Sequence, residues 1–146
     1  MENMIVMILR LLLASFLGAL IGAERDFRGK AAGMRTYLLV ALGSALMMLI
    51  SKYAFVDDGG DPSRIAAQIV TGIGFIGAGA IMFDKHAVHG LTTAAGIWVV
   101  AGIGMAVAAG MYVISIAATI LTIAGLEISC RNTFSRNRHS SEERDS

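Results

Sequence analysis

The stretch LTTAAGIWVVAGIGMAVAAGMYVISIAATILTIAGLEIS, residues 91–129, decides how this chain folds. It is apolar almost throughout, and as one helix it would be about 58 Å long, roughly twice the hydrocarbon thickness of a bilayer. The run must therefore fold back on itself. We predict the reversal at Ala109-Gly110-Met111, with a turn nearer Gly102 or Gly104 as the alternative.

The rest of the chain is similarly apolar. Of its 146 residues, 55% are hydrophobic and only 16% are charged, against about 25% charged residues in an ordinary soluble domain. Five stretches are long enough to span a bilayer: Met4–Ala23, Thr36–Val56, Ile65–Phe83, Leu91–Ala109 and Tyr112–Ser129. We expect an all-α membrane protein, with residues 1–130 forming a bundle of five transmembrane helices and residues 131–146 a disordered tail.

Composition also argues against several classes of protein. The longest stretch outside the spans is the tail, far shorter than the roughly 40 residues that a domain with its own core needs, so we expect no soluble enzymatic domain. The net charge of +1 and the lack of a basic stripe interleaved with aromatics argue against a nucleic-acid partner. Glu2 precedes the first span without any basic residue, which favours a transmembrane helix over a cleaved signal peptide.

Basic residues near the spans predict the orientation, because they are retained on the cytoplasmic side. The first loop is basic, whereas the connection at residues 57–61 is acidic. We therefore expect the N-terminus outside and the C-terminus in the cytoplasm. The basic residues on the inner side are Arg25, Arg28, Lys30, Arg35, Arg131, Arg136, Arg138 and Arg144.

The third span is unusually rich in glycine. Glycine weakens a helix, but in membranes small residues allow helices to approach closely, so we expect this span at the centre of the bundle. We expect its neighbour to be the first span, which carries a stripe of small residues at a spacing of four. The residues of the two stripes are Gly72, Gly74, Gly77 and Gly79, and Ala14, Gly18 and Gly22. Gly72 to Gly77 also match a dinucleotide-binding spacing, but the strand and the acidic residue which that motif requires are absent.

Polar residues inside spans are functional candidates, because an unpaired polar group in hydrocarbon is costly. Arg10 could extend to the interface, meet an outer acid such as Asp57, or line an ion or proton path. Gln68 and Thr71 share one helix face and could bond a neighbouring helix or line a cavity. The remaining candidates are Thr92 and Thr93, at the start of the fourth span.

Charged residues also flank the inner end of the first span. Glu24 and Arg25 precede the loop, and Arg35 and Thr36 follow it. They are interpreted either as interfacial anchors or as a site. An ion pair between Glu24 and Arg35 would hold the loop against the bundle.

Evidence for a metal site is weak. Asp57, Asp58 and Asp61 are suitable ligands for Mg²⁺ but lack the spacing of a known loop. His86 and His89 have the spacing of some metal ligands without a third or fourth ligand nearby. We expect no cofactor, with Mg²⁺ as a possible ligand or transported ion.

Four motifs together resemble the bacterial MgtC/SapB family. They are Gly18–Arg25, Ala32–Thr36, Ala66–Gly79, and Gly90–Ala95 followed by Trp98. The resemblance covers roughly Leu9 to Tyr112. The matching functional candidates are Glu24, Arg25, Arg35, Thr36, Gln68, Gly72, Gly74, Gly77, Gly79, Gly90, Thr92 and Thr93.

The resemblance implies a multi-pass protein of the bacterial inner membrane, associated with low-magnesium adaptation, stress and virulence. It also implies the F-type ATP synthase as a candidate partner. Well-known members continue into a cytoplasmic domain after the spans, so this chain is expected to be the short, SapB-like form. Where members commonly have arginine before Gly90, this chain has His89.

The leading hypothesis is a non-enzymatic protein that modulates Mg²⁺ or proton homeostasis through helix contacts. Its partners would be membrane lipid and either further copies of itself or another membrane protein. The alternative is a small Mg²⁺ or proton transporter or channel, whose path would be lined by Arg10, Gln68, Thr71 and Thr92.

Overall fold

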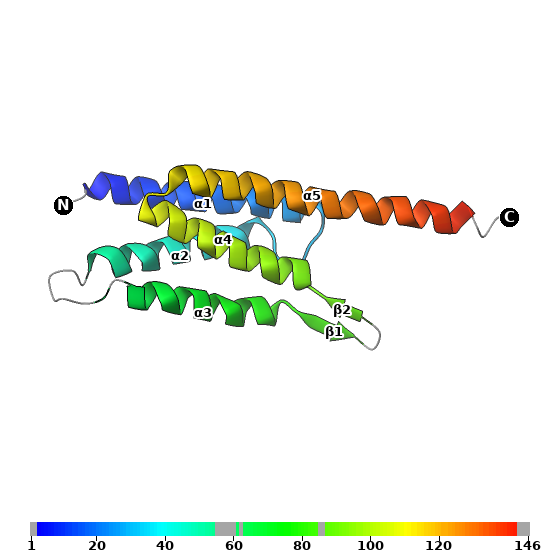
Figure 1. The fold of residues 1–146 in the computed structure, drawn as a ribbon, viewed down its shortest axis with the longest axis horizontal. Coiled ribbons are helices and arrows are strands. Elements are labelled where there is room, and N and C mark those ends of the chain that lie inside the picture. The colour runs from blue at the N-terminus through cyan, green and yellow to red at the C-terminus, as the bar shows by residue number, and fades with distance from the viewer. Residues whose placement is uncertain (1–2, 55–60, 62, 85–86, 143–146) are drawn as a thin grey trace.

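The computed structural model describes residues 3–54, 61, 63–84 and 87–142, with side chains in the last helix as far as Glu127. The described chain is mostly helical (Figure 1). Its helices are α1 (Met4–Phe27), α2 (Met34–Tyr53), α3 (Ser63–Gly79), α4 (Leu91–Ala109) and α5 (Tyr112–Glu142). Two short antiparallel strands, β1 (Met82–Asp84) and β2 (Ala87–His89), join α3 to α4.

The predicted reversal of the long apolar run is confirmed. Helix α4 ends at Ala109, and Gly110 follows in the left-handed conformation with φ of 91°. The backbone N–H of Gly110 donates to Val107 at 3.0 Å, and that of Met111 donates to Ala106 at 2.9 Å. These bonds satisfy carbonyls that the end of α4 would otherwise leave unpaired, and glycine adopts this conformation without steric cost.

The hairpin between α3 and α4 corrects the all-helical expectation. Phe83 of β1 pairs with Val88 of β2, and β1 begins inside the third span, which was predicted to continue to Phe83. Gly90 then precedes α4 as its N-cap with φ of 87°, and a Cβ there would overlap the carbonyl of Ala80. The hairpin therefore sets where α3 ends and α4 begins.

Helix α4 lies at the centre of the bundle. It packs against α1, α2, α3 and α5, whereas α3 lies at one edge and packs on α2 and α4 (Figure 1). The prediction that the glycine-rich third span occupies the centre is wrong. The physical reason is that α4 presents buried small and β-branched residues on several faces, while α3 buries only Ile73 and Gly77.

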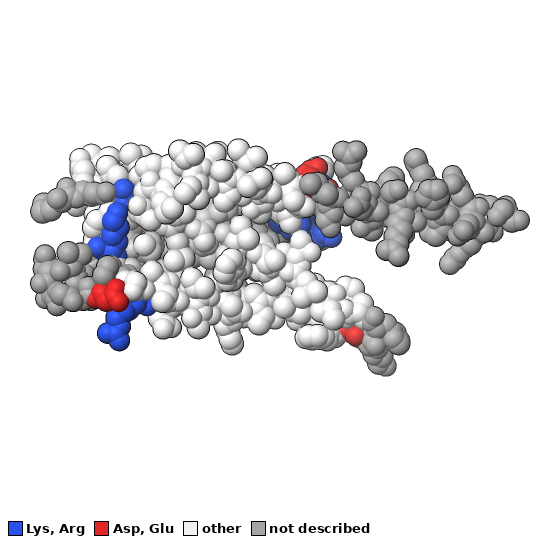
Figure 2. Space-filling model, viewed as in Figure 1, with Lys and Arg blue, Asp and Glu red and all other residues white. Residues whose placement is uncertain are grey.

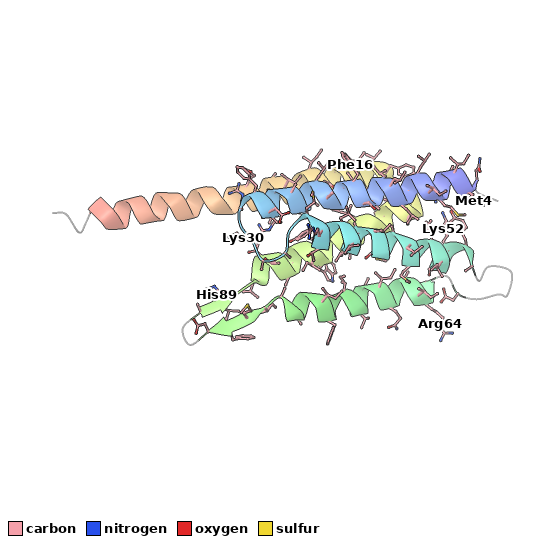
Figure 3. All side chains as sticks on the ribbon, turned by 180° about the vertical axis from the view of Figure 1, so that it is seen from behind. Met4, Phe16, Lys30, Lys52, Arg64 and His89 are labelled. Atoms are coloured by element: carbon pink, nitrogen blue, oxygen red, sulfur yellow. The ribbon has the colours of Figure 1, made fainter. Side chains whose placement is uncertain are left out.

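The distribution of charge fits a membrane-embedded bundle. Charged side chains gather at the two ends of the face shown in Figure 2, and the belt between them is uncharged. Figure 3 shows Lys52 and Arg64 towards one end, Lys30 and His89 towards the other, and Phe16 projecting from the side between them. Phe16 is 59% exposed, which is costly in water and favourable in lipid.

Helices α1, α2 and α4 are long and apolar enough to cross a membrane. Helix α3 is shorter, with 17 residues, and the described apolar part of α5 is Tyr112–Glu127. The described chain is thus a helical membrane protein with three candidate spans by this measure.

Helix α5 continues past the bundle to Glu142, although the composition of residues 131–146 predicted no regular structure. No glycine or proline follows Gly125. A helix that has already formed extends at low cost when nothing interrupts it, because the unfavourable nucleation step is past.

Candidate functional site

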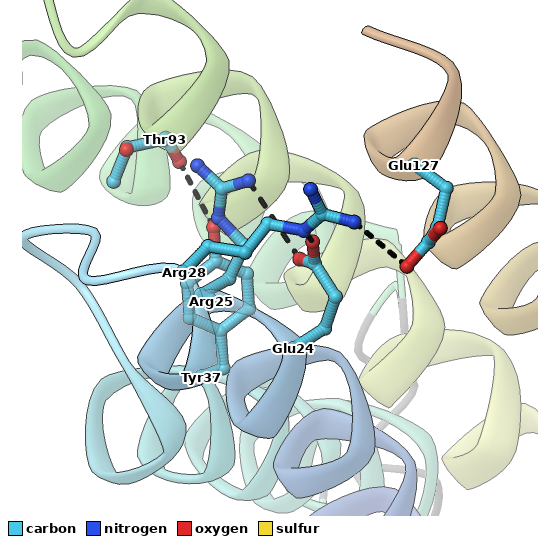
Figure 4. Close-up of polar contacts among 6 residues, drawn as sticks. All are labelled: Glu24, Arg25, Arg28, Tyr37, Thr93 and Glu127. Carbon is cyan, nitrogen blue, oxygen red and sulfur yellow. Dashed lines mark hydrogen bonds and ion pairs between the residues drawn. The ribbon is translucent and has the colours of Figure 1, made fainter. Parts of the chain in front are cut away.

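A cluster of charged residues lies where the end of α1 meets α5 (Figure 4). Arg25 Nη1 lies 3.7 Å from Glu24 Oε2, and Arg28 Nε also pairs with the Glu24 carboxylate. Arg28 Nη2 lies 2.8 Å from Glu127 Oε1 on α5. We call Glu24, Arg25, Arg28 and Glu127 the charged cluster. It places Glu127 at the same end of the bundle as the loop after α1.

The inner part of the charged cluster is removed from solvent. The side chains of Glu24 and Arg25 are 10% and 4% exposed, whereas Glu127 is 56% exposed. Neither carboxylate oxygen of Glu24 has a hydrogen-bond partner of good geometry in the described part of the chain, so its attraction to the arginines is ionic. Removing one partner of such a buried pair leaves an uncompensated charge, which costs about 3–5 kcal/mol.

Tyr37 of α2 links the region beside the charged cluster to α4. Its ring is fully buried, and its hydroxyl donates to the carbonyl of Thr93 at 3.4 Å (Figure 4). A Cβ at Gly96 would overlap that hydroxyl, and one at Gly22 would meet the Tyr37 Cβ at 2.9 Å. One tyrosine therefore packs between α1 and α4 because both helices carry glycine there.

The loop between α1 and α2 is held by Asp26. Its Oδ2 accepts the backbone N–H of Met34 at 2.9 Å, and a Cβ at Gly33 would overlap the same carboxylate. Asp26 thus satisfies a donor at the start of α2, which Gly33 cannot cap with a side chain. Glu24 and Arg35 do not form an ion pair, because Glu24 pairs with Arg25 and with Arg28 directly after α1, and Arg35 is exposed.

Arg10 lies at the opposite end of the bundle and is 6% exposed. Its Nε donates to the Tyr112 hydroxyl at 2.8 Å, and its Nη1 donates at 3.0 Å to both the Tyr53 hydroxyl and the Ala108 carbonyl. The side chain is bonded within the end of the bundle instead of extending to the interface. It joins α1 to α2 and to the turn between α4 and α5. Asp57, the predicted outer acid, lies outside the described residues.

The four residues proposed to line an ion path do not converge. Gln68, Thr71 and Thr92 are exposed on the bundle surface, whereas Thr93 is buried. Arg10 meets the end of α4, about 24 Å along that helix from Thr92 at its start. The Thr71 hydroxyl donates to the Ala67 carbonyl of its own helix at 3.3 Å.

The glycines of the two predicted stripes differ in their surroundings. A Cβ at Gly18 would lie 2.7 Å from both the Ala41 Cβ and the Tyr37 carbonyl oxygen, so the stripe of α1 packs on α2 and not on α3. Gly77 alone among the α3 glycines has a neighbour, with the Ala94 carbonyl oxygen 3.6 Å from its Cβ position. The three with no atom within 4 Å are Gly72, Gly74 and Gly79.

A groove of about 510 Å³ runs between α2 and α3. Arg35 and Thr36 lie in the first turn of α2 and line one part of it. Gly43 and Gly72 leave space in its wall, because no atom lies within 4 Å of their Cβ positions. The larger apolar lining residues are Leu39, Val40 and Met47 of α2 and Ile69, Ile73 and Ile76 of α3.

No group of three or more histidine, cysteine, aspartate or glutamate side chains forms a metal site within the described residues. Asp57, Asp58, His86 and Cys130 lie outside the side chains that the structure describes. Asp61 accepts the backbone N–H of Ser63 at 2.8 Å and so caps α3. This hydrogen bond, with that of the Ser63 side chain, holds the pKa of the Asp61 carboxyl below its usual value.

Sequence reasoning missed Tyr37, Gly96 and Gly104 as determinants of packing. A Cβ at Gly104 would overlap the carbonyl of Ala41 on α2. Gly96 and Gly104 are eight residues apart and so share one face of α4. Their spacing could have indicated a helix face packed against a neighbour. The glycines of α3 are more closely spaced and suggested the same, yet a Cβ at Gly72, Gly74 or Gly79 would meet no atom within 4 Å.

A family model described as the MgtC family matches residues 11–132. The chain belongs to the MgtC family. It is 51% identical over 133 residues to the Escherichia coli K12 protein named "Putative magnesium transporter YhiD". The matched region covers 87% of this chain and 62% of that protein. No solved structure matches the chain.

Two further relatives of this MgtC-family chain are informative. "Protein MgtC" of Salmonella typhimurium LT2 is 52% identical over 116 residues, covering 80% of this chain and 49% of that protein. An uncharacterized protein of Haemophilus influenzae is 40% identical over 128 residues, covering 82% of this chain and 54% of its own. The chain therefore spans about half to three-fifths of the length of these relatives.

Three of the four motifs that carry the family resemblance have residues at one end of the bundle, whereas Ala66–Gly79 runs along α3. Glu24 and Arg25 lie in the last turn of α1, Thr36 lies in the first turn of α2, and Gly90 and Thr93 lie at the start of α4. The structure brings these segments together through Tyr37, whose hydroxyl bonds Thr93 beside Arg25 (Figure 4). The end of the MgtC-family bundle that holds the charged cluster is therefore its candidate functional end.

Proposed function

We propose that this MgtC-family chain is a non-enzymatic membrane protein that modulates Mg²⁺ or proton homeostasis by docking α3 against a partner membrane protein. The relation to magnesium is supported by family membership and by the name of the Escherichia coli relative. The partner is either a second copy of this chain or a different membrane protein. The F-type ATP synthase is a candidate implied by the family resemblance.

The observation that carries this proposal is the open surface of α3. We define its outer face as Gln68, Thr71, Gly74, Phe75 and Gly79. All five residues are exposed, and Phe75 is 85% exposed. Gly74 and Gly79 have no atom within 4 Å of their Cβ positions. Small residues allow close helix contact in a membrane, and polar side chains such as Gln68 favour a protein neighbour over lipid.

The proposed setting is the bacterial inner membrane, with five spans, the N-terminus outside and the C-terminus in the cytoplasm. The contact between Arg28 and Glu127 supports an odd number of crossings, because it places the loop after α1 and the apolar end of α5 at one end of the bundle. Basic residues are retained on the cytoplasmic side, so that end faces inward. Roles in low-magnesium adaptation, stress and virulence are part of the same proposal.

The docking proposal is tested by leucine substitutions on α3. Gly74→Leu and Gly79→Leu add a side chain where this chain has no neighbour, so they should leave the fold intact and block the partner. Cross-linking in membranes from Phe75→Cys, in a Cys130→Ser background, should give a defined adduct that both leucine variants abolish. Gly77→Leu is the contrasting control, because it is directed at Ala94 and should disturb the contact between α3 and α4 instead.

The docking proposal makes a second, functional prediction. In a bacterial host that lacks its own relative, growth at low magnesium should be restored by the chain and not by Gly79→Leu. Full restoration by a variant that forms no cross-linked adduct would contradict the proposal.

The alternative function, transport of Mg²⁺ or protons, is favoured by the name of the Escherichia coli relative. Liposomes loaded with a magnesium or pH indicator separate the two functions. Modulation predicts no flux above that of empty vesicles. Flux that is lost in Gln68→Leu would favour transport, with Gln68 lining a path formed between copies.

A further inference from the structure

The groove between α2 and α3 combines a long apolar wall with a cation. Its apolar lining comes from both helices and includes Leu39, Met47 and Ile76. Its volume of about 510 Å³ lies within the range of roughly 300–1,000 Å³ that is typical of small-molecule sites. Only Arg35 among its lining residues is charged.

The position of Arg35 shows which end of the groove is polar. Arg35 lies in the first turn of α2, at the end of the bundle that holds the charged cluster. Met47 lies about 18 Å further along the same helix. One leaflet of a bilayer has a hydrocarbon depth of about 15 Å. The groove thus extends from the membrane interface through about one leaflet.

Arg35 is available to a ligand at this place. Its side chain is exposed and does not pair with Glu24, whose carboxylate pairs with Arg25 and Arg28. No ion pair joins Arg35 to any acid among the residues that the structure describes. Thr36 beside it contributes a hydroxyl group to the same groove.

We propose that this groove binds an anionic phospholipid, with one acyl chain between α2 and α3 and the phosphate held by Arg35 and Thr36. Guanidinium forms charge-assisted hydrogen bonds with phosphate oxygens. The apolar walls and the open positions at Gly43 and Gly72 accept the chain. A net negative headgroup is favoured because no described acid balances the positive charge of Arg35, and a zwitterionic headgroup balances it less well than an anionic one.

The proposal is tested by native mass spectrometry of the detergent-solubilised chain, titrated with phosphatidylglycerol and with phosphatidylcholine of identical acyl chains. We expect about tenfold tighter binding of phosphatidylglycerol, the size of one charge-assisted contact. Arg35→Gln should abolish this preference, and Arg35→Lys should keep most of it. Equal binding of the two lipids, or an unchanged preference in Arg35→Gln, would overturn the proposal and leave only unselective lipid contact.

Further measurements distinguish the contribution of the acyl chain to binding from that of the headgroup. Gly43→Leu fills the groove at a position with no neighbour within 4 Å, so it should weaken binding of both lipids about tenfold without unfolding the chain. Gly74→Leu lies outside the groove and should change neither. Millimolar inorganic phosphate should not displace the lipid; displacement would overturn the proposal in favour of a site for the free anion.

The lipid site and the docking of α3 can fail separately. Lipid binding is measured on the isolated chain with Gly43 and Arg35 variants, whereas docking is measured by cross-linking with Gly74 and Gly79 variants. Loss of lipid selectivity with intact cross-linking would contradict the lipid site alone.

Discussion

Helices α3 and α4 are both apolar and rich in glycine, yet they have opposite places in the bundle. In α4, Gly96 and Gly104 face Tyr37 and the backbone of Ala41, so the absence of a side chain lets α2 pack closely. In α3, the glycines at 72, 74 and 79 face open space. The comparison shows that glycine content predicts a capacity for close contact and does not tell which helix provides the contact. In α4 the capacity is used within the chain, whereas Gly72, Gly74 and Gly79 of α3 have no neighbour among the described residues, and Gly74 and Gly79 belong to the face that we propose docks a partner.

The largest effect is expected at the centre of the bundle. Gly104→Leu places a side chain against the carbonyl of Ala41, and overpacking of this kind costs about 3 kcal/mol. Thermal unfolding in detergent should show a clear loss of stability. The matched control is Gly102→Leu on the same helix, where no atom lies within 4 Å of the Cβ position. Similar losses in both variants would show that α4 is not packed as described.

The next largest loss of stability is expected when the hydrogen bonds that join Arg10 of α1 to the end of α4 are removed. Arg10→Met keeps an apolar stem but removes the donors to Tyr53, Tyr112 and the Ala108 carbonyl. Leaving buried acceptors unsatisfied costs about 1–3 kcal/mol. Unfolding followed by tyrosine fluorescence should report the loss. Arg64→Met, at the exposed start of α3, is the control and should change stability by less than about 0.5 kcal/mol.

A smaller effect of opposite sign is expected on α3. Gly74→Ala adds a methyl group that meets nothing, and alanine is favoured over glycine in a helix by up to about 1 kcal/mol. Stability in detergent should therefore rise slightly. A decrease would mean that Gly74 already has a close neighbour, which would remove the contrast between α3 and α4.

The smallest effect is a pH dependence at the start of α3. Because the pKa of Asp61 is lowered in the folded chain from its usual 3.8, its capping contribution is fully present above that value and is lost as the pH falls through the folded pKa. Hydrogen exchange of the Ser63 amide should accelerate in that acidic window. The matched variant Asp61→Asn, which keeps a capping oxygen without a charge, should exchange independently of this titration, and an identical acid response in Asp61→Asn would exclude the assignment.

Much of the fold was predictable from local sequence. The turn at Gly110 follows from the length of one apolar run, which is about twice the thickness of a bilayer. The helical nature of the first two spans follows from their apolar length. The hairpin was missed because Met82 and Phe83 of β1 are apolar and continue the pattern of the helix before them.

The candidate site was predictable in its residue types but not in its pairings. Glu24, Arg25 and Arg35 were singled out as charges that flank the first loop, but Glu24 pairs with Arg25 in the last turn of α1 and with Arg28 directly after it. That choice leaves Arg35 exposed at the groove. The bonds of Arg10 also join segments that lie about one hundred residues apart in the chain, such as Tyr112, and no local pattern records them.

The sequence by itself determined that this chain is a helical membrane protein, because the length and hydrophobicity of its segments decide whether lipid can replace water around them. The family motifs add which residues are candidates for function. Only the tertiary structure decided that α4 is central, that α3 keeps an open face, and that Arg35 is left beside a groove. These facts depend on which helix faces meet, and a helix face is occupied or open only after all its neighbours are in place.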